Sequence, residues 1–210
     1  VSTQSTGIYK GAEKDKKFRI VLLGSKNSGK STLLFKFAQS TDKFAREPRK
    51  AGIDEYDIEL QTSSGVASCS FVDYNFPDLN ISPQQTEAVC TADCLLVVTE
   101  CLKSPVEQCV NAVKKLNFGQ LIVLVGNKFD DWDPDQLNMQ QMNGYAALLG
   151  GPAIQVSAKT GLNFDDLQFM VADLLMNPQQ KYQQVVERQN VQMGKAGKTK
   201  DDKKSKCKGM

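Results

Sequence analysis

The stretch FRIVLLGSKNSGKS, residues 18–31, decides the fold of this 210-residue chain. Its first six residues are rich in branched apolar side chains and predict a buried strand, and the periodicity of residues 30–40 predicts a helix. Between them the sequence matches G-x-x-x-x-G-K-[ST], in which the glycines let backbone N–H groups turn toward phosphate oxygens. A plain glycine turn is the alternative, but a strand, this loop and a helix in that order predict a phosphate-binding site.

Within that loop, each residue type has a physical role. We expect Lys30 to reach the terminal phosphates as a point charge and the Ser31 hydroxyl to ligate Mg²⁺. The candidate phosphate-binding residues are Gly24, Ser25, Lys26, Asn27, Ser28, Gly29, Lys30, Ser31 and Thr32.

The rest of the chain alternates short apolar runs with helical periodicity, which is typical of a parallel sheet flanked by helices. Further strands are predicted at 53–60, 67–73, 93–99, 120–126 and 152–156, and further helices at 83–91, 104–117, 135–149 and 163–176, the third of these four opened by Asp133 and Pro134. The strands at 18–23, 93–99 and 120–126 are apolar throughout and should lie at the centre of the sheet. Residues 62–65, TSSG, predict a hairpin, the single antiparallel pair expected.

Composition excludes several classes of protein. With 40% hydrophobic and 24% charged residues, the chain is neither wholly disordered nor collagen-like. It contains no histidine, which excludes Ser-His-Asp and Cys-His catalysis and zinc bound by histidine. No apolar run approaches the roughly 20 residues of a membrane span, and residues 1–17 do not resemble a secretory signal. Five cysteines are expected to be buried and reduced rather than paired or bound to metal, namely Cys69, Cys90, Cys94, Cys101 and Cys109.

A second motif, Asn127-Lys128-Phe129-Asp130, comes directly after an apolar strand. The Asp130 carboxylate can accept hydrogen bonds from N1–H and the exocyclic amine of guanine, which adenine does not offer. The Asn127 amide can reach the far edge of the base, and the Lys128 stem can lie along its face. Alone, the tetrapeptide is also compatible with an ordinary polar loop.

A third motif, Ser157-Ala158-Lys159, follows the last predicted strand. There a backbone N–H can donate to the carbonyl oxygen of guanine. Three such loops at the ends of three parallel strands predict one ligand site, because an open α/β sheet binds its ligand at that edge.

With these motifs, residues 18–176 resemble the Ras superfamily of small GTPases, and among its members Rab or Ras proteins. The resemblance implies an α/β P-loop fold, a three-layer sandwich with a six-stranded, mostly parallel sheet and about five helices. It implies GTP or GDP bound with Mg²⁺, and a switch sensed by effector and regulator proteins. It also implies that Asp73 helps to coordinate the metal; the alternative is that Asp73 is an ordinary aspartate in a turn at the end of a strand. For Phe44 it implies packing against guanine, and the alternative is a buried phenylalanine with no role in binding.

Both switch regions depart from the family pattern. Where the family has D-x-x-G followed by glutamine, residues 73–77 read DYNFP, so phenylalanine replaces glycine at Phe76 and Pro77 replaces the glutamine that orients water. Aligning Gly52 with the family's glycine puts Lys50 where a Mg²⁺-sensing threonine belongs. A shifted alignment, in which Gln84, Gln85 or Thr41 supplies the missing group, is the alternative.

The phosphate loop itself also departs, since Lys26 and Asn27 stand where Ras has two glycines. We therefore expect a guanine-nucleotide-binding protein with slow hydrolysis. No residue receives a firm catalytic assignment, although the Lys26 ammonium is a candidate for stabilising charge between the phosphates.

The predicted organisation is a disordered extension at 1–17, a GTP-binding domain at 18–177 and a flexible tail at 178–210. Residues 191–210 carry a net charge of +5 and the rest of the chain −3. The chain ends Cys207-Lys208-Gly209-Met210, which has the geometry of a prenylation box, although its two middle residues are not aliphatic. The alternative is a solvated tail with an incidental cysteine.

Lipidated at Cys207 and assisted by the nearby lysines, the protein would lie on the cytoplasmic face of a membrane, and otherwise in the cytosol. Nucleic acid is not an expected partner, because no aromatic residue lies among those lysines. Three functions therefore stand: a membrane-bound GTPase switch, a GTP-holding module that recruits partners without cycling, and a P-loop enzyme that transfers phosphate. Asp130 and the lack of an obvious substrate lid disfavour the third.

Overall fold

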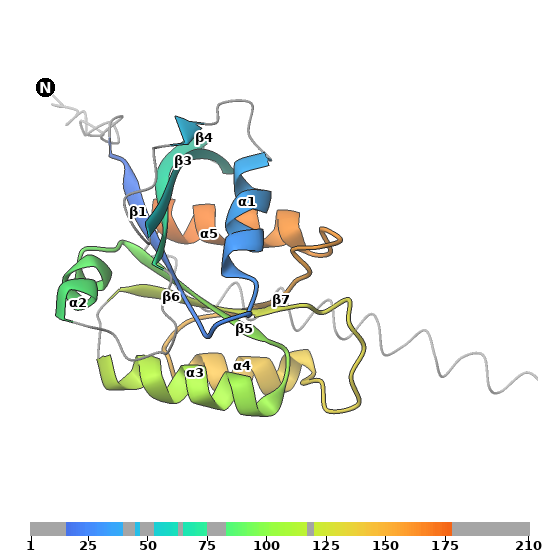
Figure 1. Cartoon of the computed structure of the whole chain (residues 1–210). Coiled ribbons are helices and arrows are strands. Elements are labelled where there is room, and N and C mark those ends of the chain that lie inside the picture. Colours follow the sequence, from blue (N-terminus) through green and yellow to red (C-terminus); the bar gives the residue numbers. More distant parts are fainter. Residues whose placement is uncertain are drawn as a thin grey trace, which may run out of the picture.

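The structure is a computed structural model that describes residues 16–39, 45–46, 53–62, 65–74, 83–116 and 120–177. Strands and helices alternate through most of the chain (Figure 1). Their order is β1 Phe18–Leu23, α1 Lys30–Gln39, β2 Ala45–Arg46, β3 Ile53–Thr62, β4 Gly65–Tyr74, α2 Pro83–Cys90, β5 Cys94–Glu100, α3 Lys103–Leu116, β6 Leu121–Asn127, α4 Met139–Ala147, β7 Ala153–Gln155 and α5 Phe164–Met176.

One sheet contains all these strands, in the order β2-β3-β4-β1-β5-β6-β7. From β4 to β7 every neighbouring pair is parallel, and β1, β5 and β6 lie inside the sheet as their apolar sequences predict. The hairpin pair β3–β4 is antiparallel as expected, with its turn at 63–64 outside the described residues. The two-residue strand β2 adds a seventh strand and a second antiparallel pair. The mostly parallel α/β sandwich is therefore confirmed.

Helices cover both faces of the sheet, α1 and α5 on one side and α3 and α4 on the other (Figure 1). Phe37 of α1 contacts Phe71 of β4 and Phe164 of α5, with ring centroids 4.6 and 4.8 Å apart. On the opposite face, Val106 and Val110 of α3 pack with Val97 in a second buried cluster. Burial on both faces explains why the central strands carry continuous apolar runs. Within the described ranges, no helix has the length and apolar character needed to cross a membrane.

The start of α4 differs from the prediction. Asn138 caps this helix, and its side chain and that of Gln141 each accept a bond from the other's backbone N–H, at 2.9 Å. This reciprocal capping box satisfies two N–H groups that a helix end leaves unbonded. Asp133 instead accepts from the backbone N–H of Asp135 at 2.8 Å, which stabilises a turn before the helix.

The prediction for the cysteines is correct except at one position. Cys69, Cys94, Cys101 and Cys109 are buried free thiols, whereas Cys90 is exposed. Cys90 is the last residue of α2, and its neighbour Val89 points into the core while Cys90 faces solvent. Only one face of this helix is therefore buried, and Cys90 lies on the other face.

Candidate functional site

The phosphate-loop motif lies between β1 and α1, as predicted. Strand order reverses at β1, which has β4 on one side and β5 on the other, so the loop sits at the point where an open α/β sheet binds ligands. A Cβ atom on Gly24 would lie 2.0 Å from the carbonyl oxygen of Val98, which only glycine avoids. The loop thus packs closely against the end of β5.

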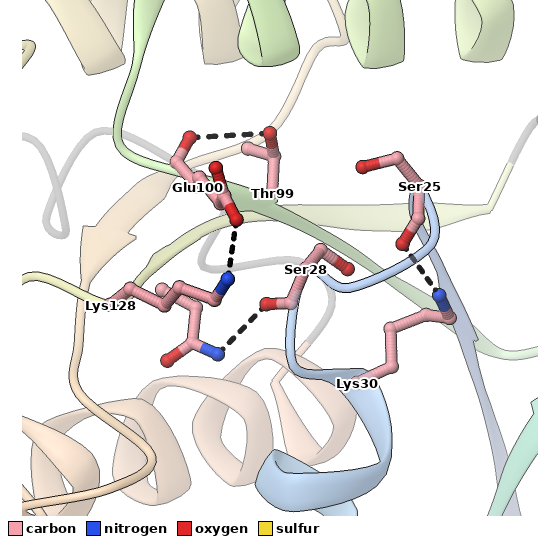
Figure 2. A network of polar contacts seen from close by, with 7 residues as sticks. Ser25, Ser28, Lys30, Thr99, Glu100 and Lys128 are labelled. Carbon is pink, nitrogen blue, oxygen red and sulfur yellow. Dashed lines mark hydrogen bonds and ion pairs between the residues drawn. The ribbon is translucent and has the colours of Figure 1, made fainter.

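Lys30 is the first residue of α1 and only 5% exposed. Its Nζ donates to the carbonyl oxygens of Gly24 and Ser25, each at 2.9 Å, so the side chain folds back over the loop (Figure 2). Burial lowers the pKa of Lys30, while the charge of Asp73 acts in the opposite direction. A buried ammonium at a helix N-terminus is suited to binding an anion.

Ser31 joins this loop to β4. Its hydroxyl donates to Oδ2 of Asp73 at 2.8 Å, and Asp73 is 3% exposed near the end of that strand. The two candidate metal-binding residues are therefore in contact, although 42 positions separate them. Lys26, Asn27 and Thr32 are exposed, with Asn27 in the left-handed region at φ 67°.

Asn127, the last residue of β6, connects the phosphate loop to the other two predicted loops. Its Nδ2 donates to the carbonyl of Ser28 at 2.9 Å, and its Oδ1 accepts from the backbone N–H of Ala158 at 3.0 Å. The backbone N–H of Phe129 also donates to the carbonyl of Val156 at 3.0 Å. All three loops are thus brought together at one edge of the sheet.

Asp130 lies beside the Ser157-Ala158-Lys159 loop. A hydrogen bond from the Ser157 side chain lowers the pKa of the Asp130 carboxyl, and the charge of Lys159, 3.9 Å away, acts in the same direction. Ser157 is completely buried, and its hydroxyl also accepts from the N–H of Thr160 at 3.0 Å. The carboxylate is therefore held in its ionised form by the loop that follows β7.

Three residues at or near this edge were not among the predicted site residues. Thr99 and Glu100 end β5 between the phosphate loop and Asn127, and Glu100 forms an ion pair with Lys128 (Figure 2). Cys109 of α3 lies next to the phosphate loop. Burial raises the pKa of its thiol, and hydrogen bonds with Ser25 and Thr99 act in the opposite direction. The polar Thr-Glu end of an otherwise apolar central strand was a signal for the first two, because ligands bind at that end of the strands.

Several predicted positions fall outside the described residues: Phe44, Lys50, Gly52, Phe76, Pro77 and Cys207. Among the residues that are described, no group of three or more histidine, cysteine, aspartate or glutamate side chains is placed to hold a metal ion.

A comparison with protein-family models matches residues 19–177 to the Ras family. A search of curated proteins found no match. The matched region begins at the second residue of β1 and runs past the end of α5, so it includes all of the sheet except Phe18 and each of the three loops. Proteins of this family are small GTPases that bind GTP and GDP with Mg²⁺. Because most of the chain fits that family, and because its loops converge at the sheet edge where such proteins bind nucleotide, the protein belongs to the Ras family of small GTPases.

Proposed function

We propose that this protein is a GTP/GDP switch selective for guanine, with slow hydrolysis, that acts on a membrane surface in trafficking or signalling. The proposal divides the chain into an extension at 1–17, the GTP-binding domain at 18–177 and a tail at 178–210. Effector and regulator proteins would be its partners in addition to the nucleotide. A GTP-holding module that recruits partners without cycling is the second candidate, favoured by the departures at Phe76 and Pro77.

The two hydrogen bonds of the Asn127 side chain are the main observation that supports a nucleotide site. This side chain bonds to Ser28 in the phosphate loop and to Ala158 in the loop after β7. Because these bonds hold the two loops next to each other, a single ligand can contact both. In the proposed site, residues 24–32 surround the phosphates. The base is held by Asn127, Lys128, Asp130, Ser157, Ala158 and Lys159.

Mg²⁺ fits the contact between Ser31 and Asp73. A hydroxyl and a carboxylate are hard oxygen donors, the class that Mg²⁺ prefers, and the two are within 2.8 Å of each other. Ser31 would hold the ion directly, and Asp73 would hold it through water. When bound, Mg²⁺ neutralises charge on the phosphate oxygens. The Lys30 ammonium contributes a further positive charge from the protein itself.

Guanine selectivity rests on Asp130. As a carboxylate it accepts hydrogen bonds from two donors on guanine, and adenine has an acceptor at the facing position. Asp130→Asn exchanges one of the two acceptor oxygens for a donor and should shift preference from guanine to xanthine nucleotides by roughly 100-fold or more.

Competition binding of GTP, ATP and XTP against a fluorescent GDP tests this assignment. Asp131→Asn is a matched control, because Asp131 is the neighbouring exposed aspartate. Equal affinity of the unmutated protein for GTP and ATP would contradict the proposed function. To separate the two candidates, effector binding is compared between the GDP-bound protein and the protein loaded with a GTP analogue, since only a switch distinguishes them.

A further inference from the structure

Glu100 occupies a position at the nucleotide edge that the sequence motifs do not include. It ends β5, which lies between β1 and β6, and these two strands lead into the phosphate loop and into Lys128. The carboxylate forms an ion pair and a hydrogen bond with the Lys128 ammonium (Figure 2). The two side chains remain 31% and 42% exposed, so they lie at the surface of the site rather than in the core.

The main chain around Lys128 is held on both sides. Before it, Asn127 is bonded to two loops, and after it the N–H of Phe129 is bonded to Val156. Lys128 itself has φ 62°, in the left-handed region that is unfavourable for a residue with a Cβ atom. The tertiary contacts on either side maintain this conformation and set the direction in which the Lys128 side chain leaves the chain.

The side chain of Lys128 is a flexible four-carbon stem, and ordering such a stem costs conformational entropy. Figure 2 shows it extending from the end of β6 toward Glu100 and the phosphate loop. Glu100 binds the ammonium at its tip, so both ends of the side chain are held. A stem ordered before the ligand arrives does not have to be ordered on binding.

From this geometry we infer that Glu100 is a positioning residue for nucleotide binding, which acts by holding the Lys128 stem in place along the face of the base. This role rests on the proposed function, because it assumes that Lys128 contacts guanine. Glu100 itself needs no contact with the nucleotide. Its negative charge opposes that of the phosphates, and pairing with Lys128 offsets this repulsion.

The test is a double-mutant cycle read from the release rate of a fluorescent GDP. Glu100→Gln should raise the release rate about fivefold, within the range measured for directly interacting pairs. Lys128→Met, which keeps an unbranched stem but removes the ammonium, should raise it as well. If Glu100 acts through Lys128, then Glu100→Gln should cause no further increase when added to Lys128→Met.

Asp57→Asn is the matched control for loss of an ion pair. Asp57 of β3 pairs with Lys17 at 2.6 Å. The exposure of these two side chains is similar to that of Glu100 and Lys128. Its release rate should equal that of the unmutated protein. The melting temperature of Glu100→Gln without nucleotide should also be unchanged, which separates positioning from a general loss of stability.

Three results would overturn the role of Glu100 alone: an unchanged release rate, a slower release because repulsion from the phosphates dominates, or the same increase in both backgrounds. An unmutated protein that does not retain GDP would instead overturn the proposed function, and the role of Glu100 with it.

Discussion

The side-chain amide of Asn127 bonds to the carbonyl oxygen of Ser28 across 99 positions of sequence, at 2.9 Å. The same amide accepts a bond from Ala158, and Asn127 is 2% exposed. A buried amide with both of its polar atoms bonded gives directional contacts that packing alone does not provide. The side chain of Asn127 therefore links the phosphate loop directly to the loop that follows β7.

Gly29→Ala should damage that connection. A Cβ atom at this position would lie 2.2 Å from Nδ2 of Asn127, and the backbone has φ 88°. Strain together with the displaced hydrogen bond should lower the free energy of unfolding by about 2 kcal/mol or more. Denaturant unfolding measures this change, and GDP release should become at least about tenfold faster.

Gly144→Ala is the control for Gly29→Ala. Gly144 lies inside α4, and a Cβ atom added there would meet nothing within 4 Å beyond its chain neighbours and the backbone of its own helix, so alanine should stabilise the helix by roughly 0.5–1 kcal/mol. Equal effects of the two substitutions would show that the contact with Asn127 is unimportant.

The affinity for guanine nucleotides should be insensitive to mild acid. Because the hydrogen bond from Ser157 and the charge of Lys159 hold the pKa of Asp130 below its usual 3.8, its carboxylate stays ionised as pH falls toward that value. Affinity for GDP should stay constant from about pH 7 to about pH 5 and be lost only as pH falls through the lowered pKa. Ser157→Ala removes the main cause of the shift, so the loss should begin at higher pH.

Fluorescence titration at each pH measures the affinity, and circular dichroism verifies that the protein remains folded. The chain has no histidine to titrate near neutral pH. A drop in affinity near pH 6 would therefore mean that another shifted group controls binding.

Intrinsic GTP hydrolysis should be slower than that of Ras, which is about 4 × 10⁻⁴ s⁻¹. Pro77 has no amide with which to orient water, and the exposed Lys26 is poorly preorganised to stabilise charge. Single-turnover hydrolysis of bound GTP measures the rate, and Lys26→Ala should leave it unchanged. A rate at or above that of Ras, decreasing in Lys26→Ala, would assign a catalytic role to this lysine.

Membrane attachment should depend on Cys207. Cys207→Ser should move the protein from membranes to the cytosol, because the lipid chain and the lysines are both required for stable anchoring. Neutralising lysines should weaken attachment by about 1 kcal/mol per charge near an anionic surface. Cell fractionation and the mass of the C-terminal peptide are the measurements.

Cys90→Ser is the control for Cys207→Ser, since Cys90 is an exposed cysteine within the folded domain. It should leave the distribution unchanged. A Cys207→Ser variant that stays on membranes, together with an unmutated peptide that carries no lipid mass, would contradict lipidation at this position.

Much of the fold could be predicted from local sequence. The strand at residues 18–23 has the bounds that its sequence predicts, and its continuous apolar run, residues 20–23, is buried as expected for a strand covered on both faces. The phosphate-loop motif also lies between a strand and a helix as predicted, since its glycines and lysine belong to one short segment. The start of α4 was missed because Asp133 and Asn138 are both plausible caps, and only the bonds each makes in the folded chain distinguish them.

The sequence by itself determined which segments form strands and helices and which loops carry the nucleotide motifs, because these properties depend on neighbouring residues. Only the tertiary structure decided that Asn127 bonds to Ser28, that Ser31 bonds to Asp73 and that Glu100 pairs with Lys128. Each of these contacts joins residues at least 28 positions apart. Such contacts depend on the order in which the strands assemble, and strand order is set by packing of the whole sheet rather than by any local pattern.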